Sequence, residues 1–393
     1  MSNVKLKPLS FHQNVSLGCD PEFFFADDRG DVIGSEKILG DTKSIGVIID
    51  GVQAELNPGA SSCRESLASG ISGCFIRIRD LIANRGDNVT LKMDTLVDIS
   101  ERELNSLSDA SRRFGCAPST NIYNEGENKT SEIKANPATY LKRSAGGHIH
   151  MGNYYSTYLT DKQNPAMREM AERIEKALKK MPEVMVPILD IIVGNTCVLL
   201  DRQPGNIERR ENYGRVGEFR IKDYGIEYRT LSNFWLRSYP LMSLVTGLCR
   251  FAVHIVSEST PGNDYVKALF DAVSLDDIVK AVNENDYDLA MKNFKAIQPI
   301  WLMAASGSGI GYWPLVSESS MKYFEHFAFR IQEKGLAYWF PQDVLKHWCG
   351  RYGAAGGWER WSYNVVAEDL RQFVIEKKVA IDLNARRPVS VSA

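Results

Sequence analysis

Short apolar runs separated by turn residues dominate the first sixty positions and predict β-hairpins. Residues 16–25 have the pattern of a strand, and a tight turn then returns the chain into a second strand at 31–33. Residues 44–57 contain two β-rich runs joined by Asp50-Gly51, a dipeptide that favours hairpin turns. We therefore expect antiparallel strands in this part of the chain.

Helices are predicted where apolar residues recur at three- and four-residue spacing. This spacing indicates an amphipathic helix over 61–83, a short helix over 101–112 and a charged amphipathic helix over 161–180. Residues 183–200 and 235–256 are more apolar and predict buried helices.

Further strands are predicted over 88–99, 144–152, 218–222 and 226–231. Between them, residues 114–136 are rich in Gly, Pro, Asn, Ser and Thr and indicate a long surface loop. The mixture predicts an α+β protein with a mostly antiparallel sheet backed by helices.

Beyond residue 260 the pattern is mostly helical, with loops at 307–313 and 350–357. We therefore predict two parts, a catalytic unit over 1–260 and a helical C-terminal region over 261–393 that packs on it. The sequence shows no internal repeat and no low-complexity tract.

Charge and composition narrow the classes of protein. The 393 residues carry 47 Lys and Arg against 49 Asp and Glu, a formal net charge of −2, and 44% are hydrophobic. This composition is typical of soluble globular proteins. It argues against disorder and against a strongly basic nucleic-acid binder, so no nucleic-acid partner is expected.

Localisation is predicted from the cysteines and the apolar segments. Seven scattered cysteines without a C-x-x-C pair indicate buried thiols in a reducing compartment. Polar or charged residues interrupt both 184–200 and 239–256, so neither predicts a membrane helix. With no apolar signal segment at the N-terminus, we expect a cytoplasmic protein with no membrane partner.

Candidate chemistry begins with polar residues that stand two apart in strand-like segments. Such spacing puts both side chains on one face of a strand, and adjacent strands would combine them into a polar floor. With 24% charged residues the spacing is common by chance, so neighbouring apolar residues and tight turns carry the argument. The pairs are Asp20 and Glu22, Glu55 and Asn57, His148 and His150, Glu218 and Arg220, and Glu227 and Arg229.

The acidic pairs are candidate metal ligands. Asp20 and Glu22 offer hard oxygen donors suited to Mg²⁺ or Mn²⁺. A solvated strand face is the alternative, although the three phenylalanines at 23–25 argue against full exposure. Glu55 is either a second metal carboxylate or a cross-strand partner of a basic residue.

The string Gly146-Gly147-His148-Ile149-His150 is the most distinctive. The two glycines allow a ligand or another backbone to approach closely. The two histidines share a face and could bind metal or phosphate oxygens, or form a structural pair.

Five arginines fall within 21 positions: Arg209, Arg210, Arg215, Arg220 and Arg229. Their planar forks match phosphate and carboxylate groups, although Glu218 and Glu227 could neutralise them in plain salt bridges. The glycine motifs of common nucleotide-binding sites are missing from the sequence, so an ATP site would need another architecture.

Four strings in this order resemble a known family: GCDPEF at 18–23, DG followed by ELNP within 50–58, GGHIHMG at 146–152 and YGIEYRTLSNFW at 224–235. Together they resemble the phage-associated carboxylate–amine ligases, or amidoligases of the second type. The resemblance to glutamine synthetase and glutamate–cysteine ligase is more distant. The resemblance to the phage-associated ligases spans roughly residues 16–240.

The resemblance implies a fold and a reaction. The fold would be a curved antiparallel sheet of the glutamine-synthetase kind, whose concave face holds metal ions, ATP and substrate. ATP would phosphorylate a carboxylate, and an amine would then displace phosphate to leave an amide or peptide bond. The partners would be a small-molecule or peptide carboxylate and an amine.

The resemblance also implies roles for individual residues. Metal binding falls to Glu22, Glu55, Glu227, Asp20 and His148, with ATP and Mg²⁺ (or Mn²⁺) as cofactors. The resemblance assigns Arg229 and His148 to catalysis and places His150 near the nucleotide phosphates. From the cluster of basic residues we also predict Arg220 in catalysis and Arg209, Arg210, Arg215 and Lys222 in nucleotide binding.

Two other functions stay open on the sequence. One is a hydrolase whose single Zn²⁺ is bound by His148, His150 and a carboxylate. The other is a non-catalytic binding protein on the same fold. The sequence does not identify the substrates, the number of metal ions or whether a homo-oligomer forms. If the protein is encoded by a phage, we expect it in the host cytoplasm.

Overall fold

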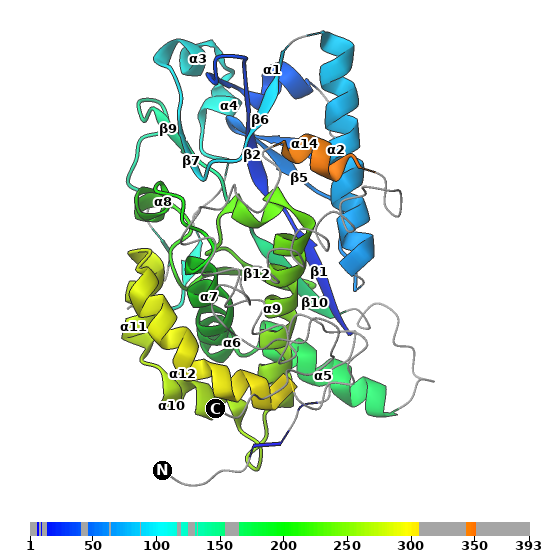
Figure 1. The fold of residues 1–393 in the computed structure, drawn as a ribbon, viewed down its shortest axis with the longest axis vertical. Coiled ribbons are helices and arrows are strands. Elements are labelled where there is room, and N and C mark those ends of the chain that lie inside the picture. Colours follow the sequence, from blue (N-terminus) through cyan, green and yellow to red (C-terminus); the bar gives the residue numbers. More distant parts are fainter. Residues whose placement is uncertain are drawn as a thin grey trace, which may run out of the picture.

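Antiparallel sheets and helices form an α+β fold, as the sequence predicts (Figure 1). The computed structural model describes residues 14–40, 46–62, 64–86, 88–115, 119–124, 133–153, 165–305 and 343–350, together with 6, 7, 9, 130 and 131.

Most of the candidate residues lie in, or one residue outside, the strands of two five-stranded antiparallel sheets. The first has the order β1 (Val15–Cys19), β10 (Ile149–Asn153), β12 (Gly225–Tyr228), β11 (Glu218–Lys222) and β8 (Thr120–Asn121). The second has the order β3 (Val32–Ile33), β2 (Glu22–Ala26), β5 (Gln53–Leu56) and β4 (Val47–Asp50), with β6 (Thr90–Lys92) also paired to β2. A separate pair joins β7 (Leu96–Asp98) to β9 (Lys142–Ser144).

The predicted strand over 16–25 is two strands in two different sheets. Gly18 in β1 pairs with His150, whereas Glu22 in β2 pairs with Glu55. Pro21 lies at the break, where it cannot donate a ladder hydrogen bond. Asp20 therefore lies at the junction of the sheets rather than inside one strand.

Two other predicted strands are also divided. The segment 88–99 forms β6 and β7, and the segment 144–152 ends one strand at Ser144 and begins another at Ile149. The predicted hairpins are confirmed, because β2 pairs with β3 and β4 pairs with β5.

The helices of the described chain are α1 (Ser35–Leu39), α2 (Arg64–Arg85), α3 (Glu101–Ser106), α4 (Asp109–Arg112), α5 (Pro165–Lys179), α6 (Pro182–Leu189), α7 (Asn195–Val198), α8 (Asn206–Asn212), α9 (Tyr239–Glu258), α10 (Tyr265–Ala272), α11 (Leu275–Asn283), α12 (Tyr287–Ala305) and α14 (Val344–Trp348). A π-helical turn, Asp190–Gly194, joins α6 to α7, and a 3₁₀ helix, Asn233–Arg237, precedes α9. Ser238 lies between that 3₁₀ helix and α9. It caps the N-terminus of α9, since its hydroxyl accepts from the Leu241 N–H at 3.5 Å.

Helices α5 and α9 pack against the first sheet, with α6 beside them (Figure 1). The buried residues of α9 and of the segment from α6 to α7 form the centre of the hydrophobic core. This layer covers one face of the first sheet, and Asp20 lies where the first sheet meets the second.

The described part of the C-terminal region is helical. Its helices α11 and α12 contact the π-helical turn and α7, and Trp301 of α12 stacks on Phe251 of α9 at 5.3 Å between ring centroids. One hydrophobic core contains residues from both sides of position 260. The predicted boundary between a catalytic unit and a C-terminal region at that position stays a prediction. The predicted loop at 307–313 and most of the one at 350–357 lie outside the described residues.

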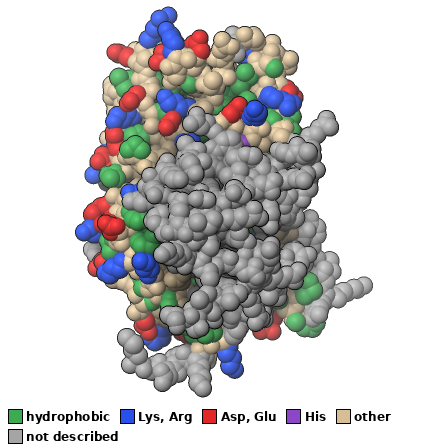
Figure 2. All heavy atoms as spheres, in the orientation of Figure 1, with side chains coloured by type: hydrophobic (Ala, Val, Ile, Leu, Met, Phe, Trp, Pro, Cys, Tyr) green, Lys and Arg blue, Asp and Glu red, His purple; other side chains and the backbone are tan. Residues whose placement is uncertain are grey.

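Within the part of the chain that the structure describes, one helical segment, Leu241–Glu258, is long and apolar enough to cross a membrane, and a second would qualify only if α5, α6 and α7 formed one sharply bent span. The first is 89% buried within the protein, as core helices are. Lys, Arg, Asp and Glu are interspersed over the described surface in Figure 2, which agrees with the near-neutral net charge.

Candidate active site

The register of the first sheet aligns three candidate residues. His150 on β10 pairs with Glu227 on β12, which pairs with Arg220 on β11. The predicted polar floor is therefore confirmed for these three strands. Of its other members, Glu218 begins β11, two residues before Arg220, and His148 and Arg229 lie one residue beyond the strand ends.

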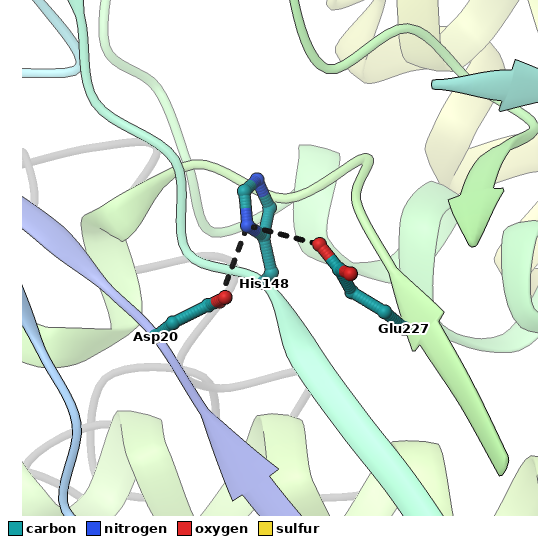
Figure 3. Close-up of side chains that lie close together, drawn as sticks. All are labelled: Asp20, His148 and Glu227. Atoms are coloured by element: carbon teal, nitrogen blue, oxygen red, sulfur yellow. Dashed lines mark ion pairs between the residues drawn. The ribbon is translucent and has the colours of Figure 1, made fainter. Parts of the chain in front are cut away.

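Asp20, His148 and Glu227 form the first group of candidate ligands (Figure 3). Nδ1 of His148 lies 3.1 Å from Oδ1 of Asp20 and 3.7 Å from Oε1 of Glu227. His148 and Glu227 are buried. Nδ1 of His148 and Oδ1 of Asp20 are buried and face one another, and neither has a further aligned hydrogen-bond partner among the described residues.

The imidazole of His148 is neutral at physiological pH. Burial lowers its pKa to about 4, and the nearby charge of Arg229 acts in the same direction. A neutral imidazole has one lone pair that can bind a metal ion.

Glu22, Asp50 and Glu55 form the second group, with one oxygen of each within 4.8 Å of the others. Glu22 and Glu55 are paired across β2 and β5, and Asp50 ends the neighbouring strand β4. Burial raises the pKa of Glu22 to about 8, with the charge of Asp50 adding to it. Burial and then the charges of Asp20 and Glu22 raise the pKa of Glu55 to about 10.

Tyr213 joins the two groups. Its hydroxyl donates to Oε1 of Glu22 at 3.1 Å and lies 2.5 Å from Nε2 of His148. The roles in the second contact depend on the tautomer of His148. With the proton on Nε2, Nδ1 carries the lone pair and faces Asp20 and Glu227; with the proton on Nδ1, His148 donates to Asp20.

The two glycines of the histidine motif make room for neighbouring protein groups. A Cβ on Gly146 would lie 2.7 Å from both Nε2 of His148 and the Tyr213 hydroxyl. A Cβ on Gly147 would lie 2.3 Å from the carbonyl oxygen of Ser232. Close approach of another segment, which the sequence indicated as one alternative, is therefore confirmed.

Basic residues surround Glu227. Arg229 contacts its Oε1, Lys222 Nζ lies 3.0 Å from Oε2, and an Arg220 nitrogen lies 3.8 Å from Oε1. His150 lies outside the first metal group, with Nε2 2.9 Å from Oδ2 of Asp20.

The arginine cluster predicted from the sequence divides in two. Arg209 donates to the Thr230 carbonyl at 2.8 Å, Arg210 to Oδ1 of Asn285 at 3.4 Å, and Arg215 to the Arg210 carbonyl at 2.8 Å. These three therefore make local contacts around α8, whereas Arg220 and Arg229 lie beside the acidic residues.

The residues present fit divalent metal ions. The first group offers two carboxylates and a neutral imidazole nitrogen, and the second offers three carboxylates, a donor set typical of Mg²⁺ or Mn²⁺. A cation would also offset the repulsion that raises the carboxylate pKa values.

Sequence reasoning missed Asp50 and Tyr213. Asp50 was interpreted only as a turn residue. It ends the strand β4, which pairs with the strand β5 that holds Glu55, so the predicted hairpin was the signal that could have placed it near Glu55. Tyr213 carries no local signal, because only the tertiary fold brings it from the end of α8 to Glu22 and His148.

The family model described as phage phiEco32-like COOH.NH2 ligase-type 2 matches residues 174–267. The matched segment includes α8, β11, β12 and α9, and so holds Tyr213, Arg220, Glu227 and Arg229. No curated protein gives a significant match to the chain. The match supports the resemblance indicated by the motifs, of which the string at 224–235 lies within it, and shows that this segment is similar to the phage phiEco32-like carboxylate–amine ligases of type 2.

Proposed function

We propose that this protein is an ATP-dependent ligase that joins a carboxylate to an amine through an acyl phosphate. The observation that carries the proposal is the pair of acidic groups linked by Tyr213, with Arg220, Lys222 and Arg229 around one of them. The family match supports the ligase class. We further propose that the two sheets correspond to the glutamine-synthetase-like arrangement that the motifs imply.

In this proposal Asp20, His148 and Glu227 hold one Mg²⁺ or Mn²⁺ ion, and Glu22, Asp50 and Glu55 hold another. Divalent ions would supply charge neutralisation for the phosphate oxygens. The protein contributes the fixed positions of its ligands, which Tyr213 orients in both groups at once.

The basic residues around Glu227 would bind the phosphates. Arg229 is buried and held against Glu227, so its guanidinium is preorganised to face the charge that develops on the transferred phosphoryl group. Arg220 and Lys222 are partly exposed on the β11–β12 hairpin and would contact the outer phosphate oxygens. His150 pairs with Glu227 across the sheet and contacts Asp20, and it would bind the nucleotide as well.

The reaction would have two steps. A substrate carboxylate oxygen attacks the terminal phosphorus of ATP, the bond to the bridging oxygen breaks, and ADP leaves. An amine nitrogen then attacks the acyl carbon, the bond to the phosphorylated oxygen breaks, and phosphate leaves as the nitrogen loses a proton. Both steps depend mainly on positioning and on charge neutralisation, which this arrangement of carboxylates and arginines would provide.

The zinc hydrolase alternative is less well supported. It needs both histidines on one ion, whereas His148 is grouped with two carboxylates and His150 is not part of that group. A set of donors so rich in oxygen favours Mg²⁺ over tetrahedral Zn²⁺.

We propose that the enzyme acts in the cytoplasm on small-molecule or peptide substrates. A homo-oligomer is compatible with this proposal.

The test is ADP release with panels of amino acids, polyamines and peptides in the presence of ATP and Mg²⁺, with mass spectrometry of the products. We expect ADP release that requires both a carboxylate and an amine, and loss of this activity in Glu22→Gln and Arg229→Ala with the fold intact by circular dichroism. Activity equal to wild type in either variant would contradict the assignment. Binding of substrates without ATP turnover would favour the binding-protein alternative.

A further inference from the structure

A buried carboxylate lies behind the first sheet, in the helix layer. Asp190 begins the π-helical turn between α6 and α7 and is fully buried beside apolar residues such as Leu189 and Ile191. Burial raises the pKa of Asp190 to about 7, although hydrogen bonds from Tyr228 and Tyr123 oppose the shift. The protein therefore keeps a carboxylate at a position where burial disfavours its charge.

The donors to this carboxylate come from one end of the first sheet. The Tyr228 hydroxyl on β12 donates to Oδ1 of Asp190 at 2.7 Å. The hydroxyl of Tyr123, two residues after β8, donates to Oδ2 at 2.9 Å. The amide of Gly217, directly before β11, also donates to the carboxylate. Because β12, β11 and β8 are consecutive in the sheet, one carboxylate connects three neighbouring strands to the core helix.

The π-helical turn places Asp190 against the sheet. The Asn195 amide donates to the Asp190 carbonyl, five residues earlier, and π-helical turns of this kind are frequent at functional sites. Gly194, at the end of the turn, lies close to Tyr228, since a Cβ there would be 2.7 Å from the tyrosine hydroxyl. Glycine therefore leaves the space in which Tyr228 reaches the carboxylate.

Tyr228 lies between two residues of the candidate active site. Side chains alternate along a strand, so Tyr228 points into the helix layer while Glu227 and Arg229 point to the opposite face. Oε1 of Glu227 lies 3.7 Å from Nδ1 of His148 and also contacts Arg229. A hydrogen bond that fixes Tyr228 from behind therefore also restrains the backbone on which Glu227 and Arg229 lie.

We propose that Asp190 is a positioning residue of the candidate active site, which acts through Tyr228 to hold Glu227 in place. Asp190 belongs to neither acidic group and takes no part in the reaction itself. This inference rests on the proposed function, because it takes Glu227 as a metal ligand. A merely structural carboxylate would need both tyrosines alike, whereas positioning depends on the bond to Tyr228.

The test compares the two tyrosines that donate to the same carboxylate. Tyr228→Phe removes the hydrogen bond from β12, and Tyr123→Phe removes the one from the chain after β8. Mn²⁺ binding is titrated by electron paramagnetic resonance, and thermal unfolding is measured in parallel. We expect Tyr228→Phe to weaken the binding of one Mn²⁺ ion by about 10-fold, as for the loss of a group that orients a metal ligand. Tyr123→Phe should lower the unfolding temperature and leave Mn²⁺ binding unchanged.

Asp190→Asn tests whether the effect passes through this carboxylate. The change keeps the shape of the side chain but leaves one acceptor oxygen for two tyrosines, so binding of the same Mn²⁺ ion should weaken. Combined with Tyr228→Phe it should cause little further loss, because both changes remove the same hydrogen bond.

Asn195→Asp is the matched control. Asn195 is also fully buried in this helical segment, but its side chain is hydrogen-bonded to Ala290 and Asn293 of α12. We expect this variant to be less stable and to bind Mn²⁺ as wild type does.

Several results would overturn the inference. They are unchanged Mn²⁺ binding in Tyr228→Phe, an equal effect of Tyr123→Phe or Asn195→Asp, additive effects in the double variant, and no Mn²⁺ binding by wild type. If Asp190→Asn does not fold, the comparison of the two tyrosine variants decides.

Turnover separates this inference from the proposed function. With ATP, Mg²⁺, a carboxylate and an amine, Tyr228→Phe should lower kcat by about 10- to 100-fold and leave KM for the amine unchanged, as for misplaced catalytic groups. Weaker Mn²⁺ binding in Tyr228→Phe without ADP release by wild type would refute the ligase and leave Asp190 as the positioning residue of a metal site. ADP release at the wild-type rate in Tyr228→Phe would support the ligase and overturn the role of Asp190.

Discussion

The Tyr213 hydroxyl offers a sharp test of the coupling between the two acidic groups. Tyr213→Phe removes one oxygen atom and keeps the ring that packs beside Arg229 and Arg209. The change deletes the 3.1 Å bond to Glu22 and the 2.5 Å contact with His148 while leaving every proposed ligand in place.

The expected effect follows from these two bonds. Removing a partner that orients a ligand typically weakens metal binding by about 10- to 100-fold, or about 1.4 to 2.7 kcal/mol. Because the hydroxyl contacts both groups, the loss should appear at both proposed metal sites. His148 would also lose the contact that fixes its tautomer.

The assay is Mn²⁺ titration followed by electron paramagnetic resonance, with Tyr265→Phe as the control. Tyr265 also donates a hydrogen bond, to the Lys7 carbonyl at 2.6 Å, but it is not among the groups around the acidic residues. We predict weaker Mn²⁺ binding in Tyr213→Phe alone. Affinity within twofold of wild type would refute the reasoning that Tyr213 orients the ligands.

Three further predictions concern single positions. Asp50→Asn should weaken binding of one Mn²⁺ ion and leave the other, as counted in the same titration; loss of both or of neither would contradict two separate groups. Gly147→Ala should lower the unfolding temperature, because its Cβ would lie 2.3 Å from the Ser232 oxygen, whereas Gly262→Ala has open space and should not. Burial raises the pKa of Asp190 to about 7, so its contribution to stability is present below about pH 4 and declines up to about pH 7. Urea unfolding across that range should show a smaller decline in Asp190→Asn, and an unchanged pH profile would contradict the raised pKa.

Local signals predicted many of the elements. The hairpins around Asp50-Gly51 and before Ile33, the helix over 61–83 and the buried helix over 183–200 all follow from spacing and turn residues. These elements are specified by neighbours in the sequence, so a pattern can identify them.

The division of the strands followed from tertiary structure. The apolar pattern through 16–25 is continuous, and only pairing with β10 on one side of Pro21 and with β5 on the other assigns the halves to two sheets. That division moves Asp20 and Glu22 into different acidic groups. A pairing register between distant segments is not encoded in either segment alone.

The site shows the same limit. Motif residues such as Glu22, His148 and Glu227 were predicted and do come together in the fold. Tyr213 was not, because a single tyrosine after a helix has no distinguishing pattern. The arginines were grouped by closeness in sequence, but the helix α8 and the strand β11 carry them to different surroundings.

Transfer of oxygen from a carboxylate to phosphate tests the central claim most directly. Amino acids or peptides carrying ¹⁸O in their carboxyl groups are incubated with the protein, ATP, Mg²⁺ and an amine, and the released phosphate is analysed by mass spectrometry. An acyl phosphate predicts one ¹⁸O atom in each phosphate together with one amide bond formed. Phosphate without the label, or no phosphate with any acceptor, would contradict the account.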